Sequence, residues 1–385
     1  MKRTSIPTRF RVSVLVVIFG LVAAAYAVLP RQASVAGAVS TQAVDGVVVS
    51  GAGKVLPPAN GAYLGVFEPD APFDMSALDT YASVSSRTPA IVMWFQAWDP
   101  SGNSSFDASA CADILARGSV PLITWEPWNP GADANYVVNP ALQSQYSLAK
   151  INSGKYDSYI RSWARGVKSV EGPVMIRPLH EMNGTWYPWG GTVNGNSPAA
   201  FRAAWIRIHK IFANEGATNV TWVWSINHAS VPNTYQNRYA AYYPGSAYVD
   251  WTSISGFNWG TSRPGFKWRV FSQIFNAPLT YLIDPKGPRK PIILTEFGTA
   301  TNGGDKPGWI RSSYGSIKAR PYIDAVVYYD KREVGLKGEQ DWQITTSWQA
   351  WLAYRKATGD PYFVAGVLPT PTVEATASPG ATPAP

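Results

Sequence analysis

Two glutamates of this sequence follow apolar runs, at points where buried strands would end. Glu181 closes PVMIRPLHE (173–181), and Glu296 lies in PIILTEFGT (291–299). Burying a polar group is costly unless it is hydrogen-bonded, so such strand ends need a reason. Two carboxyl groups at one place can divide the work of cleaving a glycosidic bond, because one protonates the leaving oxygen while the other stabilises or traps the positive centre.

Aromatic side chains surround these strand ends. RPLHEMNGTWYPWG (177–190) contains two tryptophans, and ITWEPW (123–128) ends another apolar run with two more. The apolar faces of sugar rings pack against exposed tryptophans, while short polar side chains bind their hydroxyls. We therefore predict that several tryptophans face a cleft as stacking platforms. The four candidates are Trp125, Trp128, Trp186 and Trp189.

Each of these features also has a purely structural explanation. Glu296 alone could be a hydrogen-bonded strand end, Glu181 beside His180 could be a buried pair, and many of the 17 tryptophans must belong to the core. HEMNG begins like the zinc motif H-E-x-x-H, but Gly184 occupies its fifth position, so no metal site is predicted. No Gly-rich nucleotide fingerprint is present, and no cofactor is expected.

Arg177 precedes Glu181 on the same predicted strand. Side chains alternate along a strand, so 177, 179 and 181 should share one face. Arg177 could then hold a fixed positive charge beside the carboxyl groups, or it could simply tie neighbouring strands together.

Eight apolar runs alternate with segments of helical periodicity. One such segment, AAFRAAWIRIHKIFANEG (199–216), carries an apolar stripe with a 3.6-residue period and ends at a glycine. The predicted strands are 62–67, 90–98, 120–128, 173–181, 220–228, 251–259, 291–299 and 324–331. Strands alternating with helices indicate a parallel sheet, and eight of them favour an α/β fold closed as a (β/α)₈ TIM barrel.

In such a barrel the carboxyl ends of all strands meet at one mouth, which carries the active site. Glu181 and Glu296 would then be neighbours in space, on the fourth and seventh strands. Residues 60–366 are predicted to form this single catalytic domain, with 30–59 as a linker and 367–385 as a Pro/Thr-rich disordered tail.

The first 29 residues resemble an export signal or membrane anchor. A basic start precedes the uncharged stretch Val12–Leu29, which contains the small-residue triplet Ala25-Tyr26-Ala27. This stretch is also just long enough to span a bilayer. We expect an extracellular or cell-surface protein, attached to the membrane or cell wall through its termini if the leader is retained.

Charge and cysteine content limit which partners and which kind of stabilisation are expected. The net charge is +8 with only 15% charged residues, and four of the 33 basic residues lie within the leader. Without a Lys/Arg cluster elsewhere, nucleic acid is not an expected partner. A single cysteine, Cys111, excludes an internal disulfide, so the core must hold the domain together. We expect the protein to be a monomer, and we expect its partner to be a polysaccharide or oligosaccharide.

Several segments resemble glycoside hydrolase family 26, over about residues 60–358. RPLHEMNGTWYPWG is similar to the acid/base motif of that family, and PIILTEFG to its nucleophile strand. ITWEPW (123–128), YYPGSAYVDWTSISGFNWG (242–260) and DWQITTS (341–347) resemble its third-strand, sixth-strand and last segments.

The resemblance implies a retaining enzyme with Glu181 as acid/base and Glu296 as nucleophile. It implies that His180 contacts the sugar or the nucleophile and that Trp186 lines the cleavage subsites. Where the family usually has a strand-eight tryptophan, this chain has Tyr328 or Tyr329, and Phe257-Asn258 stands where a tyrosine commonly supports the nucleophile. The expected sugar-contacting set also includes Asn258, Trp259 and Tyr328.

The family's commonest activity is endo-β-1,4-mannan hydrolysis, so β-1,4-mannan or glucomannan is the first expected substrate. A mixed-linkage β-1,3-1,4-glucan is the alternative, and trimming of the cell's own exopolysaccharide would be the same chemistry in another role. A non-enzymatic carbohydrate-binding protein could use the same aromatic residues, but it would not need paired glutamates at strand ends.

Overall fold

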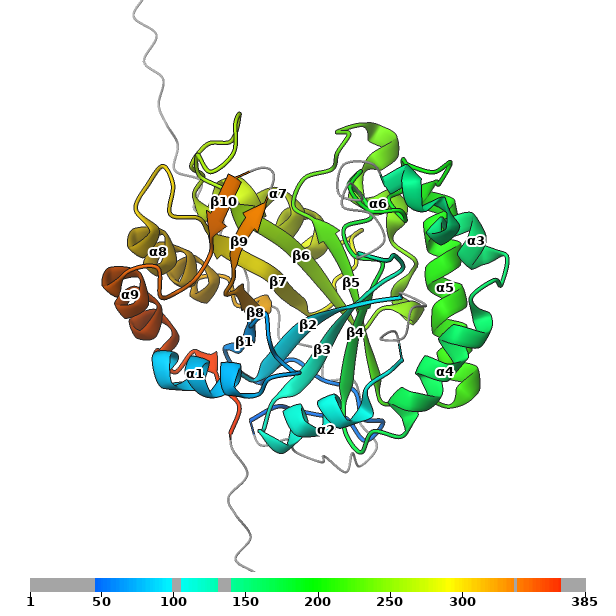
Figure 1. The fold of residues 1–385 in the computed structure, drawn as a ribbon, viewed down its shortest axis with the longest axis horizontal. Helices are drawn as coiled ribbons and strands as arrows, with labels where there is room; N and C mark the ends of the chain where they lie inside the picture. The colour runs from blue at the N-terminus through cyan, green and yellow to red at the C-terminus, as the bar shows by residue number, and fades with distance from the viewer. Residues whose placement is uncertain (1–45, 99–104, 131–139, 336–337, 368–385) are drawn as a thin grey trace, which may run out of the picture. The chain divides into compact units, whose positions relative to one another are not determined.

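The computed structural model describes residues 46–98, 105–130, 140–335 and 338–367. Eight parallel strands form its centre, and each follows one of the predicted apolar runs. They are β1 Ala62–Phe67, β2 Ile91–Ala97, β3 Val120–Glu126, β4 Val174–Pro178, β5 Val220–Asn227, β6 Trp251–Asn258, β7 Ile292–Thr299 and β8 Ile323–Tyr329. β1 pairs with both β2 and β8, so the sheet closes on itself (Figure 1). The predicted (β/α)₈ barrel is confirmed.

Helices surround the strands (Figure 1). They are α1 Ser76–Ser85, α2 Ala108–Ala116, α3 Leu148–Asn152, α4 Asp157–Lys168, α5 Pro198–Glu215, α6 Tyr239–Tyr242, α7 Phe271–Ile283, α8 Lys306–Lys318 and α9 Trp348–Thr358. Short 3₁₀ turns lie at Pro140–Tyr146, Tyr235–Asn237 and Ser246–Tyr248. None of the helices among the described residues is long and apolar enough to cross a membrane.

The helix predicted at 199–216 shows why the sequence folds this way. The Ser197 hydroxyl accepts a hydrogen bond from the Ala200 N–H, Pro198 starts α5, and Gly216 ends it in the left-handed conformation. The predicted apolar stripe is the buried face of this helix. It consists of Phe201, Ala204, Trp205, Ile208, Ile211 and Phe212.

Alternation along the strands divides the buried side chains into two layers. One layer fills the barrel and includes Met93, Leu122 and Met175. The other lies between the strands and the helices and includes Ile123 and Trp125. A residue's position in this alternation therefore decides whether its side chain can reach the mouth of the barrel.

After β8 the chain makes a two-stranded antiparallel hairpin of β9 Arg332–Gly335 and β10 Gly338–Asp341. It stands over the β6–β8 side of the barrel (Figure 1). The last strand, β11 Phe363–Val364, then pairs with the start of β1.

Residues 46–59 fall within the range predicted to be a linker, yet they pack against the barrel. Val47, Val49 and Val55 are each 2% exposed. The Trp251 indole donates to the Val55 carbonyl, and the Val55 N–H donates to the Thr221 hydroxyl. This part of the range contributes to the core because its valines fill the end of the barrel remote from the mouth. Residues 1–45, which include the predicted leader and the first part of the predicted linker, and residues 368–385 of the predicted tail lie outside the described part of the chain.

Candidate active site

A β-bulge aims Glu296 into the barrel. Leu294 lies opposite Ile254, but the next partners are Glu296 and Ser255, so β7 has one extra residue, Thr295. Thr295 and Glu296 consequently both face the barrel interior, where each contacts Arg177. Without the bulge, simple alternation would turn the Glu296 side chain toward the helices.

The chain after β4 turns Glu181 toward the same space. Leu179 and Glu181 both have φ of 53°, a left-handed conformation that residues other than glycine rarely adopt. Leu179 packs in the outer layer. The expectation that 177, 179 and 181 share one face is therefore wrong for Leu179, because regular strand geometry ends at Pro178.

Two hydrogen bonds fix the Glu181 carboxyl group. Asn227, at the end of β5, donates to Oε1 at 2.9 Å, and the Trp186 indole donates to Oε2 at 2.7 Å. Gly184 makes room for this indole, because a Cβ there would lie only 2.4 Å from a Trp186 ring carbon. Trp186 is partly exposed and covers Glu181, and its role in lining the cleavage subsites stays a prediction.

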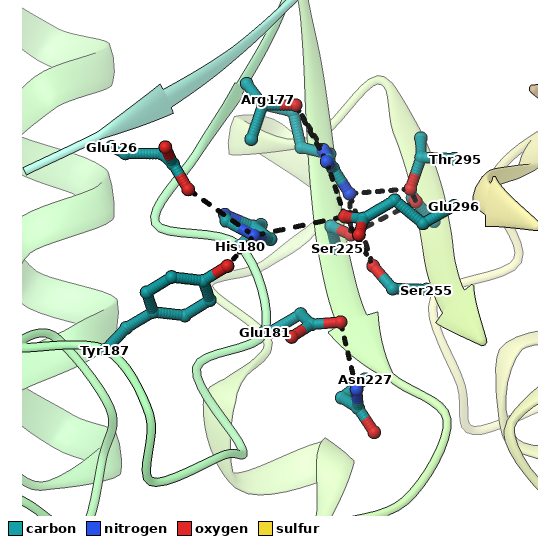
Figure 2. A network of polar contacts seen from close by, with 12 residues as sticks. Glu126, Arg177, His180, Glu181, Tyr187, Ser225, Asn227, Ser255, Thr295 and Glu296 are labelled. Carbon is teal, nitrogen blue, oxygen red and sulfur yellow. Dashed lines mark hydrogen bonds and ion pairs between the residues drawn. The ribbon is translucent and has the colours of Figure 1, made fainter. Parts of the chain in front are cut away.

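Arg177 is fully buried and holds the floor of the site together (Figure 2). Its Nη2 lies 2.8 Å from Oε1 of Glu296. The same guanidinium group donates to four hydroxyl groups from four different strands. These belong to Thr124, Ser225, Ser255 and Thr295. Both interpretations of Arg177 from the sequence thus apply, since it pairs with a carboxylate and ties the strands together.

The two carboxyl groups have different electrostatic surroundings. Burial, with the added repulsion of Glu296, raises the pKa of Glu181 to about 7, against the lowering effect of its hydrogen bonds to Asn227 and Trp186. Glu296 instead has a cationic partner in Arg177 and accepts a further hydrogen bond from Ser255. The raised pKa favours a protonated Glu181, and it lies beside a Glu296 that is paired with a cation, an arrangement that suits the two roles in glycoside cleavage.

His180 lies between Glu296 and a third carboxyl group, Glu126 (Figure 2). Its Nε2 is 3.9 Å from Glu296, 3.8 Å from Glu126 and 3.1 Å from the Tyr187 hydroxyl. Burial and the charge of Arg177 hold the pKa of His180 well below its usual value, so the ring is neutral. Burial raises the pKa of Glu126 to about 8. The His180 ring thus lies next to Glu296, and its contact with sugar or nucleophile stays a prediction.

The other three candidate tryptophans are buried. Trp125 faces the helix layer, where it stacks on Trp163 at 4.5 Å, so the prediction that it lines the cleft is wrong. Trp189 is also 0% exposed. Its indole donates to the His180 carbonyl, so it fixes the backbone of a site residue. Trp128 is nearly buried and donates to Oε2 of Glu126.

Two further candidates do not reach the mouth. Asn258 is fully buried and donates to the Thr299 hydroxyl. Tyr328 is buried in the outer layer, where its hydroxyl donates to the Trp342 carbonyl. Both predictions are wrong because these side chains point away from the barrel interior. Trp259 is partly exposed at the mouth and stays a candidate.

Sequence reasoning missed several residues of the site. Glu126 and Asn227 end strands β3 and β5, and Tyr187 lies within the aromatic motif after β4. Their strand-end positions were a usable signal, because any inward side chain at the end of a barrel strand can reach the mouth. Tyr329, and not Tyr328, is the inward residue of β8.

Comparison with known proteins agrees with this geometry. Residues 70–286 match the model of glycosyl hydrolase family 26. The chain belongs to glycosyl hydrolase family 26.

Among the relatives of this family 26 protein, Endoglucanase H of Acetivibrio thermocellus is 36% identical over 289 residues, which cover 74% of this chain and 29% of that protein. A mannan endo-1,4-beta-mannosidase of Bacillus subtilis is 25% identical over 204 residues, covering 48% and 55% of the two chains. The chain thus spans about half or less of the length of these relatives.

Solved structures share the family 26 fold. A β-mannanase from Bacteroides ovatus superposes with a TM-score of 0.58 at 18% identity, covering 80% of this chain and 91% of that one. A Bacillus subtilis mannanase superposes with a TM-score of 0.52 at 22% identity, covering 78% and 87%.

Proposed function

We propose that this protein is a retaining glycoside hydrolase that cleaves the backbone of a β-linked polysaccharide by double displacement. The observation that carries the proposal is the contrast between the two carboxyl groups. Glu181 is buried under Trp186 with its pKa raised to about 7, while Glu296 is paired with the Arg177 guanidinium at 2.8 Å. One group is suited to donate a proton, and the other to attack.

In the first step, Glu181 protonates the glycosidic oxygen while a Glu296 oxygen attacks the anomeric carbon. The bond to the leaving sugar breaks, and a covalent glycosyl–enzyme ester forms. Glu181 then takes a proton from water, which attacks the same carbon and releases Glu296. The hydrogen bonds from Asn227 and Trp186 stabilise the Glu181 carboxylate between the two steps.

We place β-1,4-mannan or glucomannan first among the substrates. The protein named mannan endo-1,4-beta-mannosidase from Bacillus subtilis and the mannanases among the solved structures support this choice. Cleavage within the chain, and not only at its ends, is part of the proposal.

A β-glucan is the second candidate, and two observations favour it. The identity to the protein named Endoglucanase H is 36%, against 25% to the Bacillus subtilis mannosidase. In addition, Phe257 and Tyr329 line the mouth where the family more often has tyrosine and tryptophan, so the sugar-contacting surface differs from the commonest family pattern.

We also propose that the protein acts outside the cell or on its surface, on the basis of the leader pattern in residues 1–29. An enzyme anchored there could trim the cell's own exopolysaccharide. Mass spectrometry of the protein recovered from membranes and from the medium will show whether the leader is cleaved. A full-length protein found only in the cytoplasm would contradict export.

The substrate is tested by product analysis of the purified protein on mannan, glucomannan, mixed-linkage β-glucan and curdlan. The proposal predicts oligosaccharides of mixed length from mannan and glucomannan. Products from mixed-linkage glucan alone would assign the second candidate. Binding to these glycans without any products would favour a carbohydrate-binding protein and contradict the enzymatic proposal.

A further inference from the structure

Glu333 lies on the β9–β10 hairpin, outside the catalytic group described above. The Tyr329 hydroxyl donates to its Oε1 at 2.8 Å, and the Trp342 indole donates to its Oε2 at 3.4 Å. Two aromatic side chains therefore fix the orientation of its carboxylate. The side chain is nevertheless 31% exposed.

Tyr329 connects Glu333 to the catalytic mouth. Its ring is stacked on Phe67 at 4.6 Å and lies edge-on to Phe257 at 5.3 Å, both of which belong to the inner layer. The pKa of Tyr329 is raised well above its usual value, mainly by burial. The charge of Glu333 is the next largest cause, and the charges of Glu296 and Glu126 contribute less. Tyr329 thus lies within the electrostatic reach of both Glu333 and the proposed nucleophile.

The order of the strands shows which part of a substrate would pass Glu333. Glu181 follows β4, and a general acid protonates the oxygen of the leaving sugar. In a closed barrel of eight strands in sequence order, β8 lies opposite β4. A polysaccharide whose leaving end lies toward β4 therefore extends its other end, the glycone, toward β8 and the hairpin that follows it.

The wall beside Glu333 has the chemistry of a sugar subsite. Trp259 and Trp342 meet edge to face at 4.9 Å, and the Arg263 guanidinium lies over the Trp259 ring at 3.8 Å. Arg263 also donates to Gln340, and its buried Nε has no hydrogen-bond partner among the described residues. Trp342 itself is buried, at 1% exposed, so Trp259 is the partly exposed ring of this wall. An aromatic ring, a cationic donor and a carboxylate acceptor therefore lie together, as sugar recognition requires.

A carboxylate has about four acceptor positions, and the bonds from Tyr329 and Trp342 occupy two of them. Lys331 forms only an ion pair with Glu333, with its Nζ 3.9 Å from Oε1, and donates no hydrogen bond to it. The remaining positions suit neighbouring hydroxyl groups of one sugar ring, because hydrogen bonds to an ionised acceptor are stronger than neutral ones.

We propose that Glu333 is a specificity-determining residue that accepts hydrogen bonds from hydroxyl groups of the second glycone sugar, counted from the cleaved bond. This inference rests on the proposed function, because it takes Glu181 as the acid and a β-linked glycan as the ligand. It adds a sugar-binding role for the β9–β10 hairpin.

The test uses aryl β-glycosides with one, two and three glycone sugars of the substrate that the glycan panel identifies. Glu333→Ala should lower kcat/KM by about 10- to 100-fold for the two- and three-sugar substrates, the range for lost hydrogen bonds to a charged group. The one-sugar substrate should change less than about twofold, since it does not reach Glu333. A change confined to longer substrates would not arise from a purely structural role.

Glu339→Ala is the matched control. Glu339 lies on the same hairpin and is exposed, where it pairs with Arg332. Its removal deletes the same charge from the same element, so the three substrates should keep their kcat/KM values. Should Glu333→Ala fail to fold, Glu333→Gln keeps an oxygen that can accept from Tyr329 and should lose part of the same increment.

An equal loss of kcat/KM for all three substrates, or no loss for any, would overturn the proposal for Glu333. Titration of the Glu296→Ala protein with a longer oligosaccharide separates this failure from a failure of the proposed function. Weaker binding after the additional Glu333→Ala change supports the subsite even without turnover. Unchanged binding overturns it.

Discussion

At the residue scale, the site depends on giving two neighbouring carboxyl groups opposite protonation states. Glu181 is covered by Trp186 and receives neutral hydrogen bonds, whereas Glu296 faces the positive charge of Arg177. Each group also affects the other, because two carboxylates at one mouth cannot both ionise cheaply. Burial and the repulsion of Glu296 raise the pKa of Glu181 to about 7, so we expect the proton to be held on Glu181.

The first prediction concerns Glu181. With its pKa raised to about 7, the fraction of protonated acid falls as the pH rises through 7, so hydrolysis of the polysaccharide should fall over the same range. Glu181→Ala should slow substrates with poor leaving groups by about 10²- to 10⁴-fold but activated aryl glycosides far less. Rate–pH profiles on both substrate types check this. A basic limb that persists unchanged in Glu181→Ala would contradict the assignment.

The second prediction concerns Arg177. Replacing it by Met removes a positive charge that lowers the pKa of Glu181, so that pKa should rise and the basic limb of kcat/KM should move to higher pH. The change also leaves Glu296 buried without its partner, and unfolding free energy should fall by about 3–5 kcal/mol. Arg177→Lys keeps a charge and should shift the limb less. An unmoved limb in a folded Arg177→Met protein would leave Arg177 with a structural role only.

At the element scale, hydrophobic patterning predicted all eight barrel strands and the helix at 199–216. Patterning could not predict where a strand departs from regular geometry. The bulge at Thr295 and the left-handed residues Leu179 and Glu181 decide where the two glutamates point. Such departures depend on contacts between strands distant in the sequence. Pro178 marks where β4 ends, but it does not predict the left-handed conformation of Leu179 and Glu181.

Alternation accounts for the errors among the aromatic candidates. Trp125 and Glu126 are adjacent on β3 and face opposite layers, as do Tyr328 and Tyr329 on β8. In both pairs the sugar-binding prediction chose the residue that points toward the helices. Counting inward positions from Leu122 or Val327 would have selected Glu126 and Tyr329 instead.

The third prediction compares two tryptophans. Trp125→Ala removes a fully buried ring and should cost about 3–5 kcal/mol of unfolding free energy, without changing oligosaccharide affinity in the folded fraction. Trp186→Ala removes a partly exposed ring and should weaken oligosaccharide binding by about 0.5–1.5 kcal/mol. Denaturant unfolding and calorimetric titration of both variants check this. A reversed pattern would place Trp125, and not Trp186, in the cleft.

At the scale of the whole molecule, the two ends of the barrel are filled differently. The site and the β9–β10 hairpin occupy one end, and residues 46–58 fill the other with valines. The Tyr63 hydroxyl also bonds to this segment, through the Val48 N–H and the Leu56 carbonyl.

The fourth prediction tests whether residues 46–58 stabilise the end of the barrel that is remote from the mouth. Val55→Ala should lower unfolding free energy by about 2 kcal/mol, because it removes buried methyl groups and leaves a cavity. Val48 is 38% exposed in the same segment, so Val48→Ala should cost less than about 0.5 kcal/mol. Denaturant unfolding of both variants provides the comparison. Equal effects would show that residues 46–58 do not contribute to the core.

The retaining mechanism is the central claim, and the stereochemistry of the first product tests it most directly. Two displacements at the anomeric carbon restore the original configuration, whereas a single displacement by water inverts it. Proton NMR during early hydrolysis of a β-linked oligosaccharide should therefore detect the β-anomer first, with the α-anomer appearing only later by mutarotation. An α-anomer formed first would contradict the assignment of Glu296 as nucleophile.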